Sequence, residues 1–199
     1  MGYNIRYGSR DVPVLRRQWI AVSGMPYRKT YQLRAGQNWT QAPETQKQTE
    51  TYVAAGPDTY EPVGAVVARE LADDGALVAG FIEMWGGVVF VDHNLVCRQI
   101  EGELATVLER VKAANDGKLG GFPDAIGIFE DGRIALREIK YVGTKDRLNA
   151  NQHRLADLLF ELFPDRIDLQ VLEWADLPRR SIVGQAAERA AFEPNRAPT

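Results

Sequence analysis

The sequence predicts an α/β fold, because helix and strand patterns alternate along its second half. From residue 101 onward the predicted order is helix, strand, strand, helix, strand, which is typical of a small sheet covered by helices. The 199 residues are 45% hydrophobic and 26% charged, a composition typical of a globular protein with one main core. This composition excludes a collagen-like, a disulfide-stapled or a wholly disordered chain.

The second half of the chain gives the clearest patterns. Helices are predicted over residues 101–114 and 148–162, and strands over residues 125–129, 134–139 and 168–174. Glu130-Asp131-Gly132 joins the first two strands, and we expect a tight hairpin turn with positive φ at both central residues. Pro164 ends the second helix.

The first half of the chain is less regular. We expect one or two short strands within residues 12–22, another over residues 27–34, and a long loop or linker over residues 36–61. A short helix is predicted over residues 62–71, and a hairpin or two strands over residues 76–91. We therefore divide the chain into a basic, β-rich N-terminal extension (1–98), a core (99–178) and a flexible tail (179–199).

The sequence argues against a membrane-spanning protein and against a secreted one. No apolar run approaches the roughly 18 residues that a membrane-spanning helix requires, and residues 1–10 lack the apolar segment of a signal peptide. The single cysteine, Cys97, has no partner for an internal disulfide or a thiolate metal cluster. We therefore expect a cytoplasmic protein with no membrane partner.

Charge is distributed unevenly along the chain. Residues 1–40 contain seven Arg and Lys residues and one Asp, a net charge of +6, so the rest carries −9 of the total of −3. Because bases stack on aromatic rings while cations neutralise phosphates, the six Tyr and Trp residues among these cations favour nucleic-acid binding. The alternative is a basic, β-rich region that packs its aromatic residues against the rest of the protein. The candidate nucleic-acid contacts are Arg16, Arg17, Arg28, Lys29, Lys145 and Arg147.

Three polar residues are expected at one end of the predicted hairpin. Glu138 and Lys140 lie two residues apart on a strand, so their side chains point to the same face. The antiparallel hairpin places Asp124, at the start of the first strand, beside them. Two carboxylates can bind Mg²⁺ or Mn²⁺, and a lysine can orient the water that attacks a phosphate. The alternative is a surface salt bridge among the three groups, with no catalytic role.

The residues around these three resemble a nuclease family. Pro123-Asp124 followed by Glu138-Ile139-Lys140 resembles the PD-(D/E)xK nuclease signature. The stretch GFPDAIGIFEDGRIALREIKYVGTKDRLNANQHRLADLL is similar to the virus-type replication-repair nuclease (VRR-NUC) branch of that superfamily. In that branch a Gly-x-Pro-Asp strand leads to a Glu-x-Lys strand and then to an Asp-Arg-Leu-x-x-x-Gln helix start, which Asp146-Arg147-Leu148 and Gln152 match. The resemblance covers residues 101–174 and implies a restriction-endonuclease-like core, a mixed sheet flanked by helices.

The resemblance implies a role for each matched residue. Asp124, Glu138 and the backbone carbonyl of Ile139 would bind Mg²⁺ or Mn²⁺, and Lys140 would position the nucleophilic water. Gln152 would orient the site or touch the phosphate; the alternative is a core glutamine bonded to backbone. We interpret the adjacent His153 as a surface residue or a phosphate contact, not as a metal ligand.

The family usually takes one more metal ligand from a glutamate in the helix before the aspartate strand. Glu103, at the start of the predicted helix, is our candidate, with Glu109 further along as a weaker one. The family commonly has an additional strand between that helix and the Pro-Asp strand, and only residues 116–122 intervene here. Either that strand is lost here, or the equivalent helix lies earlier, around Glu70.

We expect a divalent-metal-dependent DNA endonuclease that hydrolyses phosphodiester bonds. The resemblance favours flapped, branched or nicked DNA as substrate, and relatives of this size often form homodimers. Two alternatives stay open. The chain could be a catalytically inactive nucleic-acid-binding or phage structural protein that keeps the nuclease fold, or residues 1–98 could be a separate protein-interaction domain that determines the biological role.

Overall fold

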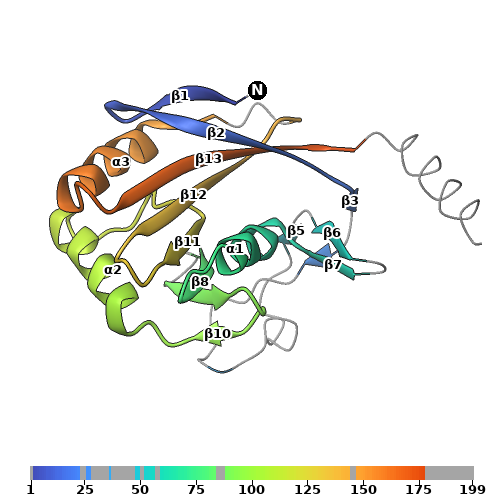
Figure 1. The fold of residues 1–199 in the computed structure, drawn as a ribbon, viewed down its shortest axis with the longest axis horizontal. Coiled ribbons are helices and arrows are strands. Elements are labelled where there is room, and N and C mark those ends of the chain that lie inside the picture. The colour runs from blue at the N-terminus through green and yellow to red at the C-terminus, as the bar shows by residue number, and fades with distance from the viewer. Residues whose placement is uncertain are drawn as a thin grey trace, which may run out of the picture.

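A mixed sheet of eight strands forms the centre of the protein, with helices on both faces (Figure 1). The computed structural model describes residues 2–22, 26–27, 36, 48–49, 52–56, 59–83, 88–143 and 147–177. The strands lie in the order β1 (Tyr3–Tyr7), β2 (Arg10–Trp19), β13 (Ile167–Asp176), β12 (Ile134–Tyr141), β11 (Ala125–Ile128), β8 (Val78–Glu83), β9 (Val89–Asp92) and β10 (Cys97–Arg98). The helices are α1 (Val63–Asp73), α2 (Gly102–Ala114) and α3 (Ala150–Leu162).

The middle of the sheet combines antiparallel and parallel pairs. Strand β11 is antiparallel to both β8 and β12, whereas β12 and β13 are parallel and joined through α3. Parallel neighbours need such a crossover, because a tight turn cannot return the chain to the same end. Strand β2 runs parallel to β13, and β1 is antiparallel to β2 at the sheet edge. Two small sheets complete the fold: β3 (Ala21–Val22), β6 (Tyr52–Gly56) and β7 (Thr59–Pro62) form one, and β4 (Pro26–Tyr27) and β5 (Gln48–Thr49) the other.

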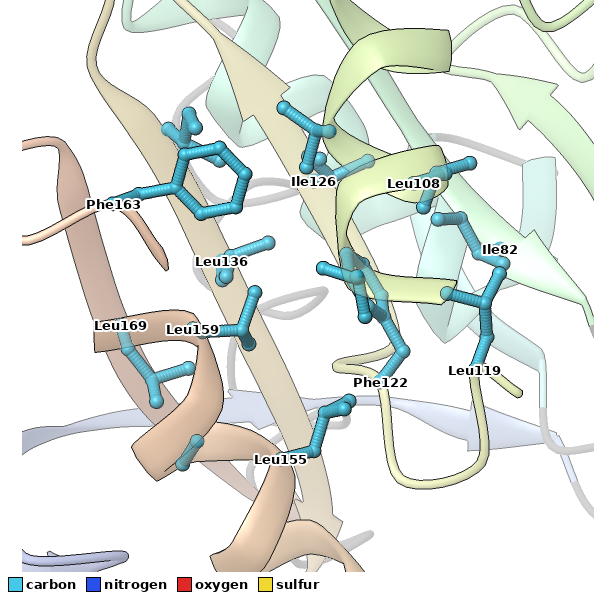
Figure 2. Close-up of a cluster of buried hydrophobic side chains, with 14 of the residues drawn as sticks. Ile82, Leu108, Leu119, Phe122, Ile126, Leu136, Leu155, Leu159, Phe163 and Leu169 are labelled. Carbon is cyan, nitrogen blue, oxygen red and sulfur yellow. The ribbon is translucent and has the colours of Figure 1, made fainter. Parts of the chain in front are cut away.

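Each face of the sheet has its own hydrophobic cluster. Helices α2 and α3 cover one face, where Figure 2 shows Leu159 of α3 pointing toward Leu136 of β12, and Leu108 of α2 beside Ile82 of β8. Helix α1 covers the other face, where Leu71 packs in a cluster that includes Phe81, Ala135 and Trp174. The three-layer arrangement buries both faces of the central strands, so these strands are apolar on both sides.

Alternation along β12 positions the polar residues of interest. Ile134 and Leu136 belong to the cluster under α2 and α3, while Ala135 belongs to the cluster under α1. Because side chains alternate along a strand, Glu138 and Lys140 continue the row of Ile134 and Leu136 on the α3 face. The carboxylate and the ammonium group therefore extend a row of core side chains.

The α/β prediction is confirmed, and the predicted helices and strands of the second half are found with shifts of one or two residues at most of their ends. The predicted helix over residues 62–71 is α1, the strands expected in residues 12–22 include β2, and those within residues 76–91 include β8 and β9. The turn before β12 differs from our expectation. Positive φ is found at Gly132 (82°) and not at Asp131, and the Gly132 N–H donates to the Phe129 carbonyl. The longer loop from Phe129 to Arg133 needs one left-handed residue, not two.

The first half of the chain departs further from prediction. The loop expected over residues 36–61 contains β6 and most of β7, and β1 was not predicted at all. The sheet also crosses the expected boundary after residue 98, because β2 pairs with β13 and β8 pairs with β11. The strand expected over residues 27–34 lies outside the described residues beyond Tyr27, as does the tail 179–199. Among the described residues, no helix is long and apolar enough to cross a membrane.

The turn between β1 and β2 docks on α3. The Gly8 N–H donates to His153 Nδ1 (3.0 Å), and the Ser9 N–H donates to Asp157 Oδ1. Gly8 has a φ of 64°, and a Cβ at this position would lie 2.5 Å from Asp157 Oδ1. Glycine is required here for both reasons, since other residues adopt this φ at a cost and the added carbon would collide with α3.

We expect Gly8→Ala to lower the free energy of unfolding by about 1–3 kcal/mol, because it adds strain at positive φ and separates the turn from α3. Urea unfolding followed by circular dichroism measures this change. Gly2→Ala is the matched control, because the nearest atom to a Cβ at Gly2 is the Val14 carbonyl oxygen at 4.0 Å. Equal stability of the two variants would contradict the proposed docking of the turn.

Candidate active site

The site is organised around the Glu138 carboxylate, which is 1% exposed at the end of the core row on β12. Three side chains from three elements donate to it. Lys140 Nζ lies 3.0 Å from Oε1, Gln152 Nε2 lies 2.5 Å from Oε1, and the Tyr7 hydroxyl lies 3.2 Å from Oε2. Burial of a carboxylate is costly unless such donors compensate it, so these bonds are needed to keep Glu138 inside.

The distribution of these donors leaves one oxygen partly available. A carboxylate has about four lone-pair positions, two on each oxygen. Oε1 receives both Lys140 and Gln152, whereas Oε2 receives Tyr7. Oε2 is therefore the oxygen with remaining capacity to bind a cation.

Asp124 faces Glu138 from the adjacent strand. The register pairs Ala125 with Arg137, so the next pair outward is Asp124 with Glu138. Asp124 Oδ2 accepts the Ile139 N–H at 2.8 Å. Gly121, three residues earlier, has a φ of 90°, and a Cβ there would lie 2.8 Å from the backbone of α3. The Gly-x-Pro-Asp stretch can therefore pass close against the start of α3 and deliver Asp124 to the site.

Gln152 links the start of α3 to Glu138. Asn149 caps the helix by accepting the Gln152 N–H, and the Gln152 side-chain oxygen accepts the Asn149 N–H at 2.9 Å, which completes a capping box. The side-chain nitrogen is then left to donate to Glu138. A glutamate, the other common residue at this position, would turn a second negative charge toward Glu138. Gln152 thus both bonds backbone, as one of our alternatives stated, and orients the carboxylate.

Tyr7 is the site residue that the sequence did not indicate. It is fully buried at the end of β1, more than a hundred residues from Glu138 in the chain. Burial, together with the charge of Glu138, raises the pKa of the Tyr7 hydroxyl far above its ordinary value, so the group stays protonated and donates. The one hint is its place among the aromatic residues of the N-terminal extension, which one of our two interpretations packs against the rest of the protein.

Burial is the main cause that raises the pKa of Glu138 to about 8, and repulsion by Asp124 adds to it. Lys140 and the Tyr7 hydroxyl oppose the shift. Two carboxylates held this close repel each other, and a cation between them would remove the repulsion.

A basic pocket of about 290 Å³ opens beside Lys140. Its lining includes Arg6, Arg147 and His153, from β1, the segment before α3 and α3 itself. His153 Nδ1 accepts the Gly8 N–H, so in the neutral ring Nε2 carries the proton and acts as a donor. This arrangement suits contact with a phosphate and agrees with our interpretation that His153 is not a metal ligand.

Several predicted site residues do not reach this place. Arg166 donates to Glu103 and also to the Gly132 carbonyl, which puts Glu103 at the opposite end of the hairpin from Asp124. Glu70 lies on α1, on the other face of the sheet, where it pairs with Arg17 through two bonds of 3.0 Å. Glu109 is exposed on α2.

The predicted nucleic-acid contacts are divided in the same way. Arg147 lines the pocket, Arg16 lies on the same face of the sheet, and Arg17 is held by Glu70 on the α1 side. Arg28, Lys29 and Lys145 lie outside the described residues, as does Asp146 of the matched motif.

The donors at the site suit a hard divalent cation with few protein ligands. Among the described residues no three His, Cys, Asp or Glu side chains come together. Mg²⁺ and Mn²⁺ commonly use one or two carboxylates and keep several waters, so Asp124 and Glu138 with the Ile139 carbonyl fit such an ion. A zinc site with four protein ligands does not fit these residues.

Comparison of the chain with protein-family models, with curated proteins and with solved structures finds no significant match in any of the three.

In the metal-free protein, stability should fall as the pH rises. The folded state keeps a proton on Glu138 up to about pH 8, whereas the unfolded chain releases it near 4.5, so stability present below pH 4.5 is lost between these values. We expect Glu138→Gln to remove this loss, a relative gain of about 1–3 kcal/mol at the alkaline end.

Urea unfolding of both proteins in EDTA across this range provides the measurement. Glu109→Gln, which changes an exposed carboxylate on α2, is the control. Parallel stability curves for wild type and Glu138→Gln would show that Glu138 does not titrate as described.

Proposed function

We propose that this protein is a divalent-metal-dependent nuclease that hydrolyses phosphodiester bonds in DNA. The observation that carries the proposal is the buried Glu138 carboxylate, set opposite Asp124 and bonded to Lys140 at one end of the sheet. An arrangement that opposes two carboxylates in a poorly solvated place weakens the fold, and such arrangements concentrate at functional sites. A surface salt bridge without a catalytic role, which is the alternative, would not require this burial.

The order of elements supports a restriction-endonuclease-like core. Helix α1 is followed by β8, which pairs with the Pro-Asp strand β11, and β11 pairs with the Glu-x-Lys strand β12. This placement of β8 would supply the additional strand that the family commonly has between the helix and the Pro-Asp strand. It favours α1 over α2 as the equivalent helix, although Glu70 on α1 faces away from the site.

The chemistry we propose is in-line attack of water on phosphorus. A bound Mg²⁺ or Mn²⁺ would neutralise the phosphate oxygens and acidify a water molecule. Asp124, Glu138 Oε2 and the Ile139 carbonyl would hold the ion, and Lys140 would orient the water and stabilise negative charge. The bond from the water oxygen to phosphorus forms as the bond from phosphorus to the leaving sugar oxygen breaks, and that oxygen takes a proton.

The basic pocket beside Lys140 supports a nucleic-acid substrate. Arg6, Arg147 and the His153 Nε2–H offer charge and hydrogen bonds to the phosphate group that enters next to the carboxylates. On the family resemblance we further propose flapped, branched or nicked DNA, cut within the strand.

Cleavage of labelled single-stranded, duplex, flap and four-way-junction DNA in Mg²⁺ or Mn²⁺ tests this proposal. We expect Lys140→Ala to reduce the cleavage rate by about 10²–10³-fold, because the water loses its orienting cation. EDTA and Asp124→Asn should abolish cleavage, and Lys118→Ala, an exposed lysine after α2, is the matched control. If no DNA is cut while salt-dependent binding persists, the protein is a binding module that keeps the fold.

Tyr7→Phe should weaken Mn²⁺ binding by about tenfold or more, because the hydroxyl orients the oxygen that would face the ion. Calorimetric titration of the DNA-free protein with Mn²⁺ measures this affinity. Tyr141→Phe also removes a single tyrosine hydroxyl, one that bonds Asp176, and should leave the affinity unchanged. Equal affinities for wild type and both variants would show that Tyr7 has a structural role only.

A further inference from the structure

A second pocket adjoins the basic pocket on the α3 face of the sheet. Strands β2 and β13 continue past the N-terminal end of α3, so this part of the face lies beyond the helix (Figure 1). The second pocket holds about 550 Å³ and is lined by residues of β2 and β13 and by Val142. Glu173 of β13 lines both pockets, which makes them neighbours. We call the two pockets together the β13 groove.

The register of the strands connects the groove to Lys140. Lys140 pairs with Glu173 across β12 and β13, and Glu173 pairs with Arg16 across β13 and β2. Paired residues of adjacent strands point to the same face, so these side chains form one row that leads from the candidate active site to the second pocket. A strand bound at Lys140 can therefore follow this row across the sheet.

The charge of the groove suits a polyanion. Arg6, Lys140 and Arg147 line the first pocket, and Arg16 lines the second. Arg17 also borders the second pocket, but its guanidinium is paired with Glu70 on the α1 face, so its charge does not contribute to the groove. Of the described residues, Glu173 is the one acid that lines either pocket, and it lies 3.7 Å from Arg16 Nε. The Arg16 side chain is 67% exposed, so it remains accessible to a phosphate.

Arg16 and Tyr3 form a stacked pair. The Arg16 guanidinium lies over the Tyr3 ring, 4.7 Å from its centre, and Tyr3 is 37% exposed. Flat groups of this kind stack on unpaired bases, which present a π face whatever their sequence. In a duplex these faces are covered by neighbouring base pairs.

We propose that the β13 groove binds a single-stranded segment of nucleic acid that runs from the scissile phosphate across β13 to Arg16 and Tyr3. This inference rests on the proposed function. It adds a second binding site and specifies that the part of the substrate bound there is single-stranded. Glu138 is 1% exposed and Lys140 8% exposed, so the phosphate must enter a recess, which an unpaired strand does more readily than a rigid duplex. A flap or a branch supplies such a strand beside a duplex.

Binding of fluorescent oligothymidylate and of a blunt duplex of equal length to the full protein in EDTA tests the proposal by anisotropy. We expect the single strand to bind more tightly than the duplex. Tyr3→Leu should weaken single-strand binding about fivefold or more, through loss of stacking. Arg16→Gln should weaken it by about three- to tenfold and reduce the slope of log K against log salt by about 0.7, the loss of one phosphate contact.

Arg10→Gln is the matched control, because it removes the same charge from the same strand. The Arg10 guanidinium lies over the Phe160 ring, 4.3 Å from its centre, near the far end of α3. This variant should bind oligothymidylate like wild type. Thermal unfolding of each variant verifies that Tyr3→Leu and Arg16→Gln remain folded.

The possible outcomes separate this inference from the proposed function. Unchanged oligothymidylate binding in Tyr3→Leu and Arg16→Gln, or tighter binding of the duplex, overturns the inference even if wild type cuts DNA. Selective loss of binding in these two variants supports the groove even if wild type cuts no DNA in Mg²⁺ or Mn²⁺. In the second case the proposed function fails and the single-strand site stands.

Discussion

The Glu138 carboxylate is the constraint on which the rest of the site depends. This buried group is held by Tyr7 from β1, Lys140 from its own strand and Gln152 from α3. The three donors connect an edge strand of the sheet, its central strand β12 and a helix that covers this face. Loss of any one partner leaves a buried carboxylate less compensated, at a cost of about 1–3 kcal/mol. The candidate active site and the packing of these elements are therefore the same set of interactions.

The N-terminal hairpin is consequently part of the site. Gly8 and Ser9 donate to His153 and Asp157 on one side of α3, and Tyr7 enters beneath them to reach Glu138. The Tyr7 and His153 rings also meet edge to face, with centroids 5.9 Å apart. A separate interaction domain over residues 1–98, one of our alternatives, is hard to reconcile with a hairpin that pairs along β13 and completes the core of the α3 face.

Local patterns predicted what local geometry determines. The spacing of Glu138 and Lys140 on a strand, and their return to Asp124 through a hairpin, follow from alternation and antiparallel pairing, and both appear in the structure. Tyr7 could not be found in this way, because its contact joins residues 131 positions apart and requires the parallel pairing of β2 with β13. Neither the 3.6-residue period of a helix nor the two-residue period of a strand indicates which strand lies at the edge of a sheet. Glu103 failed for a related reason: the helix pattern placed it beside an apolar stripe but could not indicate which end of the sheet that turn of helix would cover.

The two faces of the sheet show how structural cations differ from available ones. On the α1 face, Arg17 makes a two-pronged pair with Glu70 at 3.0 Å, and the buried Arg137 bonds Asp168 at 3.1 Å. On the α3 face, Arg6 and Arg16 lie 3.7 Å from their carboxylates and are more than 60% exposed. Short, sheltered pairs fix the fold and contribute little to binding, whereas long, solvated pairs exchange readily for a phosphate. The sequence composition grouped the arginines of residues 1–40 together as part of one basic N-terminal extension. Their geometry divides them, and those left available lie on the face where Asp124, Glu138 and Lys140 meet.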